Sequence, residues 1–167
     1  MIYLLYGDNE FKKRAALAAL VGDMEVVRRD GEELTATEVC EVVMGQSLFM
    51  LEQAVVITDA SQNVALWREL PELLGETATT VVLLEAKLDK RTKTYKWLKS
   101  HAEVREYAHF TEHQKPQLSA WCVERAKVHG AVLTAAQATA LIDRLGFDQL
   151  RLDLALQQLA LAGGEAV

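Results

Sequence analysis

The sequence has few of the residues and patterns that mark secreted, metal-binding or membrane proteins. It contains only two cysteines, Cys40 and Cys122, which lie far apart and form no CxxC pair. We therefore expect both to be small buried side chains in a reducing compartment, with no disulfide and no bound metal. No apolar run approaches the roughly 18 residues of a membrane-spanning helix. The chain begins with an apolar strand rather than a basic segment, so we expect no signal peptide and a cytoplasmic location.

Basic residues are also in deficit. The chain has 18 Lys and Arg against 24 Asp and Glu, which gives a net charge of −6. This balance argues against a protein that holds nucleic acid by bulk electrostatics alone. Half of the residues are apolar, which suffices for one good core, or for a core and a small second domain.

A phosphate-binding loop is missing where the pattern would place it. Residues 1–6 (MIYLLY) predict a buried strand, the strand breaks at Gly7, and a helical pattern follows. In a P-loop protein this turn reads GxxxxGK[ST]. Here it reads GDNEFKKR, with Asp8 and Glu10 at a helix N-terminus, where a phosphate needs positive potential. The turn indicates a nucleotide-binding scaffold that serves a purpose other than hydrolysis.

Strand-like runs and helical patterns alternate over the first 110 residues. The predicted strands are Ile2–Tyr6, Glu25–Arg28, Ala54–Thr58, Thr80–Leu84 and Glu103–Tyr107. The predicted helices are Glu10–Val21, Thr37–Met44, Val64–Leu74 and Asp89–Ser100. This alternation predicts an α/β fold with a parallel sheet covered by helices on both faces.

The pattern changes after Phe110. Capping boxes at Thr111 and Thr134 each predict the start of a helix, and a third helix is predicted from about Asp148 to Leu161. No strand pattern follows Tyr107. We therefore expect an α/β domain over residues 1–110 and a small three-helix domain over residues 111–167.

The first candidate for function is the apolar segment Gly45–Met50 (GQSLFM), between a predicted helix and a predicted strand. It is either the end of the helix tucked under the sheet edge or an exposed apolar wedge for a partner's pocket. In the second case Gln46 and Ser47 would supply orienting hydrogen bonds.

The second candidate is the basic segment Lys87–Lys99 in an otherwise acidic chain. The pattern places Leu88, Thr92, Tyr95 and Leu98 on a buried stripe and the cations outward. The segment is either a solvated helix face or a surface that meets nucleic acid or an acidic subunit.

The third candidate is a set of carboxylates at strand ends. Asp8, Asp59 and Glu85, with Lys87 nearby, occupy the edge where open α/β sheets bind ligands. A receiver-like phosphoacceptor domain built on Asp8 and Asp59 is therefore an alternative, although such a site requires an acidic pair after the first strand and a lysine after the fifth. A degenerate ATPase is a third possibility. The four histidines show no metal-ligand spacing.

These segments together resemble the delta subunit family of the bacterial DNA polymerase III clamp loader. The resembling stretches are YLLYGDNEFKKR, the SLF element at Ser47–Phe49, VVLLEAKLDKRTKTYKWLK, and, in the helical region 113–162, LSAWCVERAKVHG and RLDLALQQLALAGG. The resemblance implies an AAA+-like fold without a working nucleotide site, followed by a lid domain. It also implies that the chain has no catalytic residue, metal or cofactor of its own.

The resemblance also implies partners. The family's delta subunit binds the ring-shaped sliding clamp and helps to open it for loading onto primed DNA during replication. Its hydrophobic anchor falls on Leu48 and Phe49 here, flanked by Gln46, Ser47 and Met50. In a loader that encircles primed DNA, the basic segment would contact phosphates or a neighbouring clamp-loader subunit through Lys87, Lys90, Arg91, Lys93 and Lys96. The family's third, collar domain is expected to be absent from these 167 residues.

Overall fold

The computed structural model describes residues 1–44, 52–75 and 77–163. The chain divides into two compact units, one of residues 1–8 and 12–107, the other of residues 9–11 and 108–167. None of the described helices is long and apolar enough to cross a membrane.

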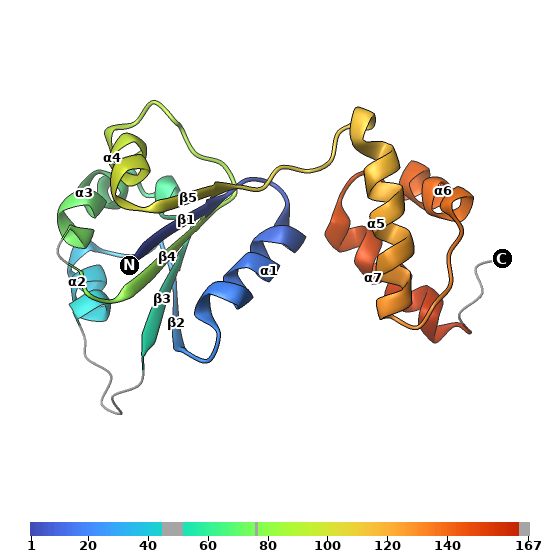
Figure 1. Cartoon of the computed structure of the whole chain (residues 1–167). Coiled ribbons are helices and arrows are strands. Elements are labelled where there is room, and N and C mark those ends of the chain that lie inside the picture. Colours follow the sequence, from blue (N-terminus) through green and yellow to red (C-terminus); the bar gives the residue numbers. More distant parts are fainter. Residues whose placement is uncertain (45–51, 76, 164–167) are drawn as a thin grey trace. The chain divides into compact units, whose positions relative to one another are not determined.

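A parallel sheet forms the centre of the first unit (Figure 1). Its described strands lie in the order β2-β3-β4-β1-β5. Their bounds are β1 Ile2–Tyr6, β2 Glu25–Asp30, β3 Gln53–Thr58, β4 Thr80–Glu85 and β5 Glu103–Glu106. The inner strands β3, β4 and β1 are nearly continuous apolar runs, as expected when both faces of a parallel sheet are covered. The predicted parallel α/β sheet is confirmed.

Helices cover the two faces of this sheet (Figure 1). Helix α1 (Glu10–Val21) lies on one face, where Leu17 and Val21 pack with Leu5, Val56 and Val82 of the strands. The opposite face carries α2 (Ala36–Met44), α3 (Val64–Leu74) and α4 (Lys93–His101).

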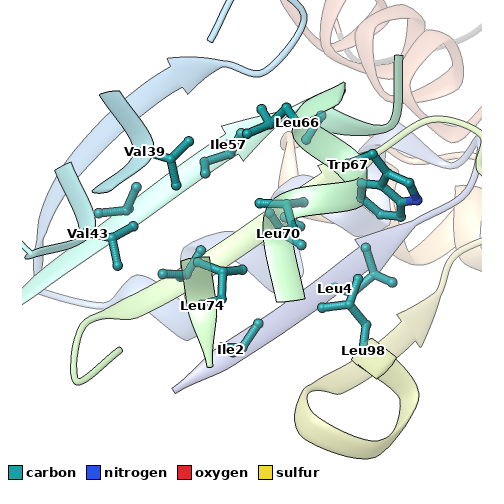
Figure 2. Close-up of a cluster of buried hydrophobic side chains, with 14 of the residues drawn as sticks. Ile2, Leu4, Val39, Val43, Ile57, Leu66, Trp67, Leu70, Leu74 and Leu98 are labelled. Carbon is teal, nitrogen blue, oxygen red and sulfur yellow. The ribbon is translucent and has the colours of Figure 1, made fainter. Parts of the chain in front are cut away.

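The larger hydrophobic cluster lies on the face of α2, α3 and α4 (Figure 2). Figure 2 shows Val39 and Val43 of α2 beside Ile57, and Leu70 and Leu74 of α3 above the strands. Successive residues of a strand enter opposite clusters, Leu4 this one and Leu5 the other, because side chains alternate along a strand.

Helix α4 begins later than the sequence pattern predicts. The predicted helix starts at Asp89, whereas α4 starts at Lys93 with Thr92 as its N-cap. The Thr92 Oγ1 atom accepts a hydrogen bond from the backbone N–H of Tyr95, and the Asp89 side chain accepts one from the backbone N–H of Arg91. These two bonds hold residues 89–92 as a turn, which is the usual effect of Asp and Thr side chains on nearby backbone.

The second unit is a helical bundle. A short 3₁₀ turn, Glu112–Gln114, precedes α5 (Lys115–Val128), α6 (Ala135–Leu145) and α7 (Gln149–Leu161). The capping box at Thr134 is present, with Thr134 and Gln137 each bonding the other's backbone N–H. The apolar centre includes Leu118, Cys122, Ile142, Leu152 and Leu156. Cys122 is buried and Cys40 half-buried, and both are free thiols.

Candidate functional site

The predicted clamp anchor lies outside the described residues. It comprises Gln46, Ser47, Leu48, Phe49 and Met50, between the end of α2 at Met44 and the start of β3 at Gln53. The choice between a buried and an exposed segment therefore stays a prediction.

The turn from β1 into α1 occupies the position of a phosphate-binding loop, between a strand and a helix, but most of the residues of the P-loop motif are replaced. Gly7 has φ +120°, and a Cβ atom there would come within 2.2 Å of the Tyr107 carbonyl oxygen, so glycine is required. Counting from Gly7, the P-loop spacing places its second glycine at Lys12, its lysine at Lys13 and its hydroxyl residue at Arg14. The lysine position is thus retained, and the other two are not.

Lys13 is directed at the sheet rather than at solvent. Its side chain is only 4 % exposed, and the ammonium group Nζ donates to the backbone oxygen of Glu85 at 3.2 Å. In a P-loop this lysine reaches the β- and γ-phosphates. The sequence reasoning missed Lys13, although its spacing of six from Gly7 was a usable signal.

Glu85, at the end of β4, is fully buried. Its carboxylate accepts hydrogen bonds from the Ser61 hydroxyl at 2.5 Å and from the Ser61 backbone N–H at 3.2 Å. Burial raises the pKa of Glu85 to about 7, although the hydrogen bonds from Ser61 act in the opposite direction. The nearby Asp59, a non-glycine residue with a positive φ of 52°, raises the pKa of Glu85 further.

The carboxylates that the sequence singled out do follow adjacent strands. Asp59 follows β3, Glu85 ends β4 and Asp8 comes soon after β1. However, β4 lies between β1 and β3, so the strands leading to Asp8 and Asp59 are roughly 10 Å apart. A receiver-type sheet has the order 2-1-3-4-5, in which the first and third strands are neighbours. The receiver-like alternative is therefore wrong.

The predicted basic segment separates into parts with different surroundings. Lys90 turns toward the sheet: its Nζ donates to both carboxylate oxygens of Glu106, at 2.9 and 2.8 Å, and lies 5.0 Å from the ring centroid of Tyr6. Tyr6 in turn donates its hydroxyl to Glu106 at 2.8 Å. The hydrogen bonds from Lys90 and Tyr6 lower the pKa of Glu106.

The other cations of the segment lie on the outer surface. Lys87, Arg91 and Lys93 line a groove between α3 and the start of α4, whereas Lys96 is exposed on α4 outside that lining. Arg91 pairs with Asp89, with 3.0 Å between Nη2 and Oδ2. The structure thus brings three of the five predicted residues together and leaves Lys90 and Lys96 apart from them.

The second unit holds an ionic cluster that sequence reasoning did not find. Asp153 of α7 accepts hydrogen bonds from Arg125 Nε at 2.5 Å and is 2.7 Å from His129 Nε2. Burial would raise the pKa of Asp153, but the hydrogen bonds from Arg125 and His129 outweigh it and lower that pKa. The cluster links α5 to α7. Within residues 1–44, 52–75 and 77–163, no group of three or more His, Cys, Asp or Glu side chains could hold a metal ion.

The fold is similar to those of solved proteins. The Bacillus subtilis DNA clamp loader delta protein matches with a TM-score of 0.60 and 20 % identity, over 98 % of this chain and 54 % of that one. The Thermotoga maritima RuvB Holliday junction branch migration motor matches with a TM-score of 0.61 and 13 % identity, over 99 % of this chain and 57 % of that one. The AAA+-like architecture is therefore confirmed. The chain spans about half the length of these proteins, and no curated protein sequence matches it.

A family match covers most of the first unit. Residues 3–108 match the family described as DNA polymerase III, delta subunit. This range includes the β1–α1 turn, the region from α2 to β3 and the basic segment. This match extends over more than half of the chain and agrees with the similarity to the B. subtilis clamp loader delta fold. The chain belongs to the DNA polymerase III delta subunit family.

Proposed function

We propose that the chain is part of a clamp-loader subunit that binds the sliding clamp and helps to open it for loading onto primed DNA. The observation that carries the proposal is the family match over residues 3–108. The AAA+-like sheet order supports it, since clamp loaders and RuvB motors share this architecture. If the subunit has a higher affinity for the open clamp than for the closed clamp, its binding would shift the clamp toward the open state.

The β1–α1 turn supports a subunit that does not hydrolyse ATP. Lys13 stands at the P-loop lysine position, but its ammonium group is buried against the Glu85 carbonyl oxygen. Lys12 occupies the position of the second P-loop glycine, where the lack of a side chain lets phosphate approach the backbone. Arg14 occupies the position of the Ser or Thr whose hydroxyl binds Mg²⁺. ATP hydrolysis would then belong to other subunits of the loader.

The clamp contact is assigned to Leu48 and Phe49, with Gln46, Ser47 and Met50 as flanking contacts. Aromatic and aliphatic side chains that fill a pocket dominate the binding energy of most interfaces. The second unit would serve as the lid domain, and a collar domain outside this chain would join the other loader subunits. Lys87, Lys90, Arg91, Lys93 and Lys96 remain assigned to primed DNA or a neighbouring subunit.

The test is the affinity of the chain for a bacterial sliding clamp, measured by surface plasmon resonance. Leu48→Ala with Phe49→Ala should weaken binding by about 2 kcal/mol or more for each anchor. A matched control is Leu154→Ala with Leu161→Ala, which removes two exposed apolar side chains from the helical unit. This control should bind like the unaltered chain. Equal affinities of the two double variants would reject the assignment of Leu48 and Phe49.

A further inference from the structure

A groove of about 1280 Å³ lies on the outer surface of the first unit, between α3 and the segment that leads into α4. Helices α3 and α4 are neighbours on the same face of the sheet (Figure 1). The lining includes the apolar side chains of Val64, Trp67, Pro71, Leu88 and Trp97. All of the lining residues belong to the first unit.

Hydrogen bonds between its walls fix the shape of the groove. The Trp67 indole N–H donates to Thr92 Oγ1 at 3.2 Å, and the Thr94 hydroxyl donates to the Trp67 carbonyl oxygen at 2.6 Å. That carbonyl would normally accept from the N–H four residues later, but this residue is Pro71, which has none. Thr94 therefore fills the place of a missing helical bond and joins α4 to α3. A groove with fixed walls binds a partner at a low entropic cost.

The charge of the groove is opposite in sign to that of the chain. Its cations Arg68, Lys87, Arg91 and Lys93 outnumber its carboxylates, Glu72 and Asp89. Asp89 already pairs with Arg91. In the described part of the chain, no ion pair joins Arg68, Lys87 or Lys93 to a carboxylate. In a protein of net charge −6, such a patch attracts an anionic partner.

The aromatic residues favour a peptide over single-stranded nucleic acid as that partner. Proteins that hold single strands stack bases on open aromatic faces. Trp67 is only 5 % exposed. One face of Trp97 is covered by the His101 ring, with 4.5 Å between the centroids and 8° between the planes. The groove therefore offers apolar side chains beside cations, whereas Trp67 is buried and one face of Trp97 is already stacked on His101.

We propose that this groove binds an acidic peptide segment of another protein, with an apolar side chain of that segment seated between α3 and α4. The carboxylates of the peptide lie against Arg68 on one wall and Lys87 and Lys93 on the other. The groove shares no residue with the clamp contact assigned to Leu48 and Phe49. It does share Lys87 and Lys93 with the basic segment, and for these two residues we take a protein partner rather than primed DNA.

The probes are short fluorescein-labelled peptides in which a Leu-Phe pair is flanked by Asp and Glu, titrated with the full chain and followed by fluorescence anisotropy. We expect saturable binding that weakens with salt. Replacing the acidic residues of the peptide by Asn and Gln, or the Leu-Phe pair by Ala-Ala, should each abolish most of the binding.

Charge reversals in the protein locate the site. Arg68→Glu and Lys93→Glu, on opposite walls, should each lower the affinity by roughly tenfold. The control Lys99→Glu changes the net charge equally at an exposed position of α4 outside the groove, and should lower it less than about twofold.

Four outcomes would overturn the proposal. Three are the absence of saturable binding at millimolar peptide, an equal loss of affinity in all three variants, and equal binding of the neutral peptides. A fourth is tighter binding of a thymidine oligonucleotide of the same charge, lost in the same two variants, which would assign the groove to nucleic acid.

Discussion

Replacing Thr94 by valine tests how α3 and α4 are held together. Thr94 is 2 % exposed, and its hydroxyl donates to the Trp67 carbonyl oxygen at 2.6 Å. Valine keeps the shape of threonine and removes the donor. In Thr94→Val the buried Trp67 carbonyl oxygen has lost the hydroxyl donor, and Pro71 has no N–H to replace it. We therefore expect the free energy of unfolding to fall by about 1–3 kcal/mol.

A second substitution makes the reasoning specific. In the Thr94→Val background, Pro71→Ala restores an N–H that can bond the Trp67 carbonyl within α3. We therefore expect Pro71→Ala to stabilise the Thr94→Val chain by about 1 kcal/mol more than it stabilises the unaltered chain. The control Thr37→Val, at an exposed position of α2, should change stability by less than about 0.5 kcal/mol.

The assay is urea unfolding followed by tryptophan fluorescence. Trp121 belongs to the second unit, so all variants carry Trp121→Phe, which leaves Trp67 and Trp97 as reporters of the first unit. The four chains of the Thr94 and Pro71 cycle give the coupling free energy. Additive effects, within about 0.3–0.5 kcal/mol, would show that Thr94 does not replace the bond that Pro71 lacks.

Two further predictions concern the strand ends. The pKa of Glu85 is raised from 4.5 to about 7, so the folded chain binds this proton more tightly than the unfolded chain does. We compare the free energy of unfolding of the unaltered chain with that of Glu85→Gln. The stabilisation that comes from the raised pKa of Glu85 is fully present below about pH 4.5. It decreases by at most about 3 kcal/mol as the pH rises to about 7. Urea titrations across this range measure it, and a difference that does not change with pH contradicts the prediction. Titration calorimetry with millimolar ATP and Mg²⁺ should detect no binding, because Lys13 is buried against the Glu85 carbonyl oxygen. A measurable heat of binding that disappears in Lys13→Ala would instead show a working nucleotide site.

The secondary structure was largely predictable because its signals are local. Continuous apolar runs marked the inner strands, since both faces of a parallel sheet are buried. Capping residues marked the starts of the helices in the second unit, as at Thr134. The start of α4 was misplaced because Asp89 and Thr92 are both capable of capping a helix, and only the hydrogen bonds show that Thr92 does so.

The candidate sites were only partly predictable. The sequence drew attention to the basic segment and to the carboxylates at the strand ends, and the structure places both in the first unit. It did not show that Lys90 pairs with Glu106, that Lys13 reaches the Glu85 carbonyl, or that Trp67 and Pro71 form one wall of a groove. Each of these depends on which segments become neighbours in space.

The sequence by itself determined the alternation of strands and helices, the departure from the P-loop pattern and the likeness to the delta subunit family, because short-range patterns of residues encode all three. Only the tertiary structure decided the strand order β2-β3-β4-β1-β5, and with it the separation of Asp8 from Asp59 and the burial of Glu85. The physical reason is that hydrophobic burial is non-directional. The apolar pattern of a segment specifies which of its faces is buried, but only the packing of the whole chain decides which other segment covers that face.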